Sequence, residues 1–408
     1  MISIYTLTSP LHDEKAVSAV TREFLGSLNL EHSFRDADYS DYGTADLSLI
    51  YVRTGGTESV FHGLLPQLQR QSSEPFYLLT SGKSNSLAAS MEILSYLRQH
   101  GLKGEILHGS PDYVRRRAML LARVGEARRR LKGIRLGIVG NPSDWLISSN
   151  FDADRIRSRF GIELVSVSMD QLLQRFDRVG SATVASEVEA YARQIAPLRT
   201  SDSAAIKQSL TDAMRIYVAL KQLAEDYDLQ GLTIRCFDLL TSVRNTGCIA
   251  LARLNSEGYV AGCEGDVPAM LSMMIARSLL GVSGFQANPA HINPDSGEML
   301  FAHCTIPLQL TNRYELDTHF ESGIGVGIRG YVEEGPVTIF KTSGNLERVF
   351  AAEGQLLACE SKPDLCRTQQ VIRLDNPSQT SYFLTNPIGN HHVILPGHVA
   401  SLLGAMFD

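Results

Sequence analysis

The chain lacks any run of 18 or more apolar residues, so the sequence predicts no membrane-spanning helix. The N-terminus, Met1-Ile2-Ser3-Ile4-Tyr5, has no basic lead and reads directly into a strand, so no signal peptide is expected. An excess of positive charge is also absent, because the formal net charge is -6. We therefore expect neither a nucleic-acid partner nor an anionic membrane partner.

Paired cysteines are lacking as well. The six cysteines stand at positions 236, 248, 263, 304, 359 and 366, and none forms a CxxC pair. In a chain of this size such cysteines are typical of reduced, mostly buried thiols. Together with the missing signal peptide, they predict a cytoplasmic protein.

A length of 408 residues predicts two or three domains rather than one core. Residues 1–133 alternate short apolar runs with helical periodicity, which predicts βαβ units and a parallel sheet. Residues 134–303 repeat this α/β pattern and carry the acidic cluster described below. Residues 304–408 are rich in Thr, Val, Ile and Gly, which predicts a β domain. The predicted fold is therefore α/β, with two Rossmann-like parallel-sheet domains followed by a C-terminal β-barrel-like domain.

The individual elements follow from the same periodicities. Strands are expected at 2–7, 47–52, 76–80, 134–139, 163–167 and 231–236. Helices are expected at 14–28, 59–70, 86–99, 111–131, 186–195, 203–227 and 268–280, with a short final helix at 397–406.

One glycine motif is expected to carry no cofactor. Residues 325–330 match the GxGxxG pattern literally, but the dinucleotide motif needs a helix after it. A strand and a turn follow here instead. A glycine-containing strand of the β domain is the favoured interpretation.

An acidic cluster and later histidines are the most informative feature. Glu264 and Asp266 lie on either side of one glycine, between an apolar run at 259–261 and a helix opening at Pro268. Loops at the carboxyl ends of parallel strands are where α/β sites form, and carboxylates and imidazoles hold divalent metals. The competing interpretation is that Asp266 only caps the helix that starts with Pro268.

The one tryptophan, Trp145, follows an expected strand and the turn Gly140-Asn141-Pro142-Ser143. In that loop its indole could stack on a sugar face or pack under the edge of the sheet. The sequence leaves both interpretations open.

Residues 231–398 resemble the sugar isomerases of the L-fucose isomerase and L-arabinose isomerase group. The resemblance is carried by Glu264-Gly265-Asp266 with the helix after it, Gly284-Phe285-Gln286-Ala287-Asn288, Phe301-Ala302-His303-Cys304 and Gly389-Asn390-His391-His392-Val393. Asn141-Pro142-Ser143-Asp144-Trp145-Leu146 is similar to the opening of the second domain in smaller relatives of fucose isomerase.

The resemblance implies an enzyme that interconverts an aldose and a ketose through an enediol, with a small sugar as its partner. It implies a divalent metal, with Mn²⁺ preferred and Mg²⁺ or Co²⁺ as alternatives, and a homo-oligomer, a trimer or a hexamer. The implied metal ligands are Glu264, Asp266, His303 and His391. The implied catalytic residues are Glu264, Asp266 and Asp238, with Asp266 or Asp238 as the base. The implied substrate-binding residues are Asn288, His303, Trp145 and His392, and His392 replaces His391 as ligand if the register slips by one.

The chain departs from the group at one position. Where the isomerases carry Asp or Glu, this sequence has Ala287-Asn288, and an asparagine cannot act as a base. Two alternatives therefore stay open: a metal-dependent sugar enzyme of another reaction, such as an epimerase, and a non-catalytic sugar-binding relative.

Overall fold

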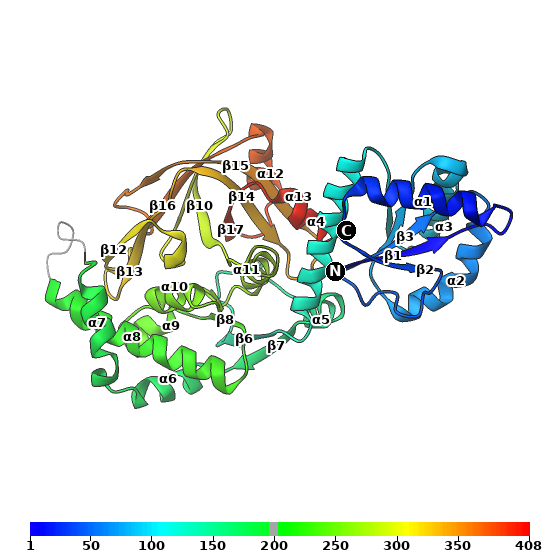
Figure 1. Cartoon of the computed structure of the whole chain (residues 1–408). Helices are drawn as coiled ribbons and strands as arrows, with labels where there is room; N and C mark the ends of the chain where they lie inside the picture. The colour runs from blue at the N-terminus through cyan, green and yellow to red at the C-terminus, as the bar shows by residue number, and fades with distance from the viewer. Residues whose placement is uncertain (196–202) are drawn as a thin grey trace. The chain divides into compact units, whose positions relative to one another are not determined.

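The computed structural model describes residues 1–195 and 203–408, and these divide into two compact units, Met1–Arg129 with Asp408 and Arg130–Phe407 (Figure 1). The predicted fold class is confirmed, because the chain forms two parallel sheets flanked by helices and a closed antiparallel barrel. Within the described residues, no helix is both long enough and apolar enough to span a membrane.

The first unit is a five-stranded parallel sheet of order β2-β1-β3-β4-β5 with helices between its strands. Neighbouring residues of its central strands belong to different cores: Tyr5 and Ile50 pack in one cluster, Ile4 and Leu49 in another. Both faces of the sheet are therefore covered, as the near-continuous apolar strands predict. Its elements are β1 (Ile2–Leu7), α1 (Glu14–Leu28), β2 (Ser33–Asp36), β3 (Leu47–Val52), α2 (Glu58–Gln71), β4 (Phe76–Leu79), η1 (Lys83–Asn85), α3 (Ser86–Gln99), β5 (Gly104–Leu107) and α4 (Pro111–Leu131).

The second unit begins with a four-stranded parallel sheet of order β7-β6-β8-β9. Its elements are β6 (Arg135–Val139), α5 (Ala153–Phe160), β7 (Glu163–Val167), α6 (Met169–Arg178), η2 (Ser181–Val184), α7 (Ala185–Ala192), α8 (Ser203–Asp226), β8 (Gly231–Ile234), α9 (Asp238–Ser242), α10 (Cys248–Ser256), β9 (Val260–Gly262) and α11 (Val267–Leu280). We call this sheet the central sheet.

A closed barrel follows, in which β10, β11, β16, β15, β14 and β17 pair in that order, all antiparallel. The elements are β10 (Phe285–Asn293), β11 (Glu298–His303), η3 (Leu308–Leu310), β12 (Arg313–Asp317), β13 (Gly327–Tyr331), β14 (Gly335–Thr342), β15 (Val349–Glu360), β16 (Thr368–Leu374), η4 (Pro377–Gln379), α12 (Thr380–Thr385), β17 (His392–Pro396) and α13 (Ala400–Ala405). The strands β12 and β13 form a separate hairpin.

Helix α11 joins the central sheet to the barrel, because it packs against β8 and β9 on one side and against β14 and β17 on another (Figure 1). Its residues are hydrophobic all round, and nearly all of them are buried. A helix of that kind belongs inside a core. The central sheet and the barrel accordingly share one hydrophobic cluster.

Most expected elements agree with the structure to within a few residues, and the helices at 14–28 and 86–99 have the predicted bounds. The GxGxxG segment lies in the hairpin strand β13 and its approach, as the strand interpretation predicts. The barrel takes β10 and β11 from before the boundary expected at 303, and the three-domain division stays a prediction.

Asn255 fixes the edge strand β9 from which the acidic loop leaves. The Asn255 amide donates to the carbonyls of Leu251 (2.9 Å) and Ala261 (2.7 Å), and its oxygen accepts from the Ala261 N–H (3.0 Å). All of these bonds are buried, so losing them leaves backbone groups without partners.

We therefore expect Asn255→Ala to lower the free energy of unfolding of the second unit by about 2–3 kcal/mol. Urea titration followed by fluorescence of Trp145 reports on that unit. The exposed Asn312, whose side chain makes no hydrogen bond in the described structure, gives the control Asn312→Ala, expected to change stability by less than ~0.5 kcal/mol. Equal effects of the two variants would contradict this role of Asn255.

Candidate metal centre

A tight loop after β9 places Glu264 at the carboxyl end of the central sheet. Glu264 and Gly265 both have left-handed backbones, with φ of 64° and 69°. A β-carbon on Gly265 would lie 2.7 Å from the Pro142 Cα, so only glycine lets this loop approach the turn after β6. The Glu264 carbonyl accepts from the Ser143 N–H (2.9 Å), which holds the strained Glu264 backbone in place.

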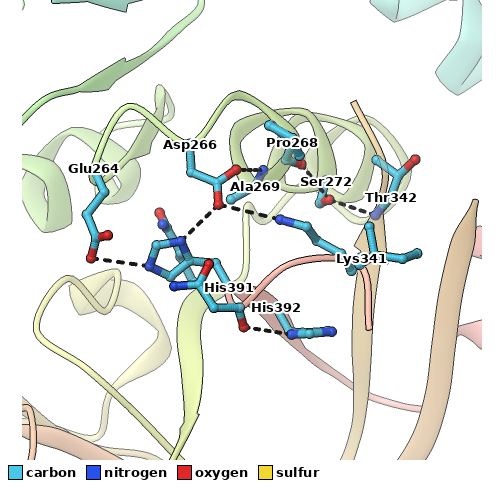
Figure 2. Close-up of polar contacts among 12 residues, drawn as sticks. Glu264, Asp266, Pro268, Ala269, Ser272, Lys341, Thr342, His391 and His392 are labelled. Atoms are coloured by element: carbon cyan, nitrogen blue, oxygen red, sulfur yellow. Dashed lines mark hydrogen bonds and ion pairs between the residues drawn. The ribbon is translucent and has the colours of Figure 1, made fainter. Parts of the chain in front are cut away.

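Asp266 both caps helix α11 and contacts a histidine. Its Oδ1 accepts from the Ala269 N–H at 2.8 Å, so the capping interpretation is confirmed. Its Oδ2 lies 2.9 Å from His391 Nδ1 and 3.6 Å from Lys341 Nζ (Figure 2). The group of donors that could hold an ion contains Glu264, His303 and His391 but not Asp266, so the role of Asp266 as a metal ligand stays a prediction.

Three neighbouring barrel segments bring Asn288, His303 and His391 together. Strand β10 lies between β11 and β17, and its Asn288 pairs with Ala302 while its Ala287 pairs with His392. His303 and His391 are each one residue along from those partners. The antiparallel register thus places residues far apart in sequence at one edge of the barrel, beside the loop that carries Glu264.

The Nε2 atoms of both histidines face Glu264. Glu264 Oε1 lies 3.3 Å from His391 Nε2 and 3.8 Å from His303 Nε2, and one donor atom from each residue lies within 4.8 Å of the others. His391 Nδ1 is engaged by Asp266, and His303 Nδ1 lies 3.0 Å from the Thr305 hydroxyl. Partners on Nδ1 that leave Nε2 free are the arrangement in which histidine binds a metal.

Two buried polar atoms show that the set fits a cation. Among the described residues, Asn288 Oδ1 has no hydrogen-bond partner, and His391 Nε2 has the ion pair with Glu264 at 3.3 Å but no hydrogen bond. A buried polar atom without a hydrogen bond is costly, and a bound ion would give both atoms a partner. The donors are two imidazole nitrogens, one carboxylate oxygen and one amide oxygen, which suit a divalent ion of the manganese or zinc type.

The charges of the site are strongly coupled. Burial would raise the pKa of Glu264, but His391 and His303 beside it hold that pKa well below the usual range. Burial would likewise lower the pKa of His391, but Glu264 and Asp266 raise it to about 9. For Asp266, the cation of Lys341 and the bond from His391 outweigh burial and lower the pKa to about 2.

His392 points elsewhere. Its Nε2 lies 3.0 Å from the Tyr382 hydroxyl and its Nδ1 lies 2.9 Å from the Asn390 carbonyl. Burial and the nearby Lys341 lower the pKa of His392 to about 3, so its ring is neutral. Of the two histidines, His391 is the one that faces Glu264.

Trp145 and Asp238 lie in different surroundings. The Trp145 indole donates to Glu264 Oε2 at 2.6 Å and makes an edge contact with Phe237, while half of its surface stays exposed. Asp238 forms an ion pair with Arg235 at 3.1 Å and is not among the residues that line the cavity beside Glu264. Stacking of Trp145 on a sugar stays a prediction.

The cavity beside Glu264 has a volume of about 50 Å³, room for an ion and one or two water-sized groups. Glu264, Asn288 and His303 line it, together with five of the six cysteines: Cys236, Cys248, Cys263, Cys304 and Cys366. All six cysteines are free thiols, and these five are buried or partly buried.

The same cavity is also lined by three residues that the sequence did not predict, Phe237, His319 and Glu321. Phe237 contacts both Trp145 and His319 through ring edges. Glu321 lies in the loop between β12 and β13, and no spacing or motif marked it. Only the fold of the hairpin beside the barrel brings it to the site.

Comparisons with known proteins point to sugar isomerases. Residues 149–279 match the family model of the L-arabinose isomerase central domain. A sulfoquinovose isomerase of Alkalicoccus urumqiensis is 25% identical over 285 residues, which cover 67% of this chain and 63% of that protein. An L-arabinose isomerase of Nocardioides sp. (strain ATCC BAA-499 / JS614) is 26% identical over 202 residues, which cover 48% of this chain and 40% of that protein.

The chain therefore spans less than two thirds of the length of these curated relatives. Its central α/β region is similar to that of L-arabinose isomerases, and its wider relatives are named as sugar isomerases. The L-fucose isomerase half of the resemblance stays a prediction, and so do the assigned roles of the site residues.

Metal binding should release protons. A pKa of about 9 means that His391 is protonated at neutral pH without a metal, whereas a histidine ligand must be neutral. We expect about one proton released per Mn²⁺ bound, and an affinity that rises about tenfold per pH unit from pH 7 to pH 8.

Calorimetry in buffers of different ionisation enthalpy measures this release. His391→Gln should abolish Mn²⁺ binding, whereas His392→Gln, the matched control, should keep it. Retained Mn²⁺ binding in His391→Gln would show that the donor set is assigned wrongly.

Proposed function

We propose that this protein is a metal-dependent aldose–ketose isomerase that acts through an enediol. The observation that carries the proposal is the convergence of Glu264, His303 and His391, with the orphaned Asn288 oxygen beside them. The similarity to proteins named as L-arabinose and sulfoquinovose isomerases supports it. A bound divalent ion would polarise the sugar carbonyl as a Lewis acid, and we propose Mn²⁺.

The residues around the donors fix their geometry. Asp266 orients His391 through Nδ1, Thr305 does the same for His303, and the Trp145 N–H holds the second oxygen of Glu264. Glu264 then presents Oε1 to the two Nε2 atoms. Such fixed ligands need little rearrangement when an ion and a substrate bind.

Isomerisation moves a proton from C2 to C1, and this transfer needs a base. The carboxylates near the site differ in how accessible they are to a substrate. Asp266 is fully buried and engaged by Ala269, His391 and Lys341, and Asp238 is paired with Arg235. Glu321 lines the cavity, and its residue is exposed. We therefore assign the base to Glu321, which would remove the proton from C2 of the aldose and return it to C1, while a proton passes from the C2 hydroxyl to the C1 oxygen.

Asn288 takes the place of an acid in the related isomerases, and its amide can supply an oxygen to the ion but cannot accept a proton. This substitution is the observation that favours the second candidate, an epimerase. Epimerisation exchanges a proton at a single carbon and returns it to the opposite face, without moving the carbonyl.

Solvent exchange separates the candidates. With Mn²⁺ and a panel of aldoses that includes L-arabinose, the protein in D₂O should form a ketose that carries deuterium at C1. Glu264→Gln should lose both metal binding and turnover. Exchange at C2 with return of an epimeric aldose would favour the epimerase, and a fully active, metal-loaded Glu264→Gln would contradict the site.

The base assignment has its own measurement. Glu321→Gln should lower kcat by about 10²–10⁴-fold, the usual contribution of a general base, while Mn²⁺ affinity stays unchanged. Glu334, an exposed acid before β14, gives the control Glu334→Gln, expected to keep full activity. Unchanged kcat in Glu321→Gln would exclude Glu321 as the base.

A further inference from the structure

Lys341 is a buried cation that the proposed reaction does not use. It lies on β14 with 1% of its surface exposed, and its Nζ makes no hydrogen bond to any residue that the structure describes. Among those residues, the one charged group within ion-pair distance is Asp266 Oδ2, at 3.6 Å. An ammonium has three N–H donors, and leaving them without acceptors in a desolvated place is costly.

Lys341 also lines a cavity of about 340 Å³. That volume falls in the range of small-molecule sites. A second cation, Arg348, lines the same cavity. Its uncharged polar side chains are the hydroxyls of Ser148, Ser149 and Ser343 and the amides of Asn150 and Asn345.

The residues that line this cavity carry two positive charges, on Lys341 and Arg348, and one negative charge, on Asp152. Asp152 is engaged as the cap of α5, where its side chain accepts from the Arg155 N–H at 2.9 Å. Pro268, in the first turn of α11, also lines the cavity, so the positive end of that helix dipole adds to Lys341 and Arg348.

The cavity is joined to the candidate metal centre by direct contacts. Figure 2 shows these contacts in series, from Glu264 to His391, from His391 to Asp266 and from Asp266 to Lys341. The three distances are 3.3, 2.9 and 3.6 Å. A group bound to Lys341 would therefore be connected to His391 through two side chains, those of Lys341 and Asp266. It would also draw the ammonium away from Asp266.

We infer that this cavity binds the anionic group of a small ligand, a phosphate, sulfate or carboxylate, through Arg348 at its rim and through the buried Lys341 ammonium, which turns from Asp266 toward the ligand. Oxyanion oxygens supply the acceptors that Lys341 lacks, and the hydroxyls and amides suit the remainder of a polyol or its hydration water. The inference does not rest on isomerase activity, because binding is measured without turnover.

Binding at this cavity should be coupled to the metal centre. With its ammonium engaged by an anion, Lys341 competes less for Asp266 Oδ2, so Asp266 accepts more strongly from His391. A stronger acceptor on Nδ1 makes Nε2 a better ligand. Anion and metal should therefore bind with positive coupling, and the coupling must be reciprocal.

Titration calorimetry with inorganic phosphate tests the site on the full chain. We expect saturable binding to the wild-type protein, at least tenfold weaker in Lys341→Met, and severalfold tighter binding of Mn²⁺ when phosphate is present. The matched control is Lys362→Met, which removes an exposed lysine paired with Glu360 and should leave phosphate binding unchanged.

Lys341→Met leaves Asp266 with one cation fewer, so its folding is checked by circular dichroism. If it does not fold, Arg348→Gln decides, because Arg348 lies at the exposed rim and its loss should weaken phosphate binding severalfold. No saturable phosphate binding to the wild type, or equal binding by it and the folded variant, would overturn the inference.

A comparison of two ligands, inorganic phosphate and glucose 6-phosphate, distinguishes the possible sources of the anion. If the anion belongs to the sugar ligand, glucose 6-phosphate binds more tightly than inorganic phosphate, and both lose affinity in Lys341→Met. If the ligand is a free anion, inorganic phosphate binds at least as tightly as glucose 6-phosphate. Both results support the site, and loss of binding in Lys362→Met but not in Lys341→Met would contradict it.

Discussion

The structure of the candidate site depends on the two oxygens of one buried carboxylate. Asp266 caps the helix that leaves the central sheet and, through its other oxygen, holds a histidine that begins a barrel strand. A fully buried carboxylate needs such partners, because an unpaired charge there would cost several kcal/mol. The same contacts that satisfy Asp266 thus align the central sheet with the barrel at the place where the donors converge.

The sum of the charges in this group of residues indicates which chemistry the site favours. Glu264 and Asp266 are negative and Lys341 is positive, so a protonated His391 makes the group neutral. Exchanging that proton for a divalent ion leaves one net positive charge in a buried place. The enediolate of the proposed reaction carries one negative charge, so the balance would be restored only as that reaction proceeds, which is how electrostatic stabilisation favours a transition state. An anion bound in the cavity that Lys341 lines would change the same charge balance by adding negative charge next to Lys341.

The sequence predicts the fold and part of the site because these rest on local signals. Periodicity was enough for most of the parallel strands and helices, although it did not mark β2, β5, α5, α6 or α10. Asp266 before Pro268 was enough for the cap. Periodicity could not distinguish His391 from His392, because a shift of one residue turns each side chain of a strand to the opposite face. The pairing of β17 with β10 is what fixes that register. Glu321 and Lys341 were missed for a related reason, since each reaches the site through tertiary contacts that leave no spacing in the sequence.

The asparagine at 288, where the resemblance implies an acid, can be explained if metal ligation and proton transfer are treated as separate requirements. An amide oxygen can complete the donor set, so Asn288 preserves a place for the ion while removing one negative charge and one proton acceptor. The lost charge leaves the site more positive toward an anionic ligand or intermediate. The lost acceptor must be replaced from outside the barrel edge, and the loop between β12 and β13 is the described segment that brings another carboxylate, Glu321, to the same cavity. A base on a loop rather than on a barrel strand would tie proton transfer to the position of that loop.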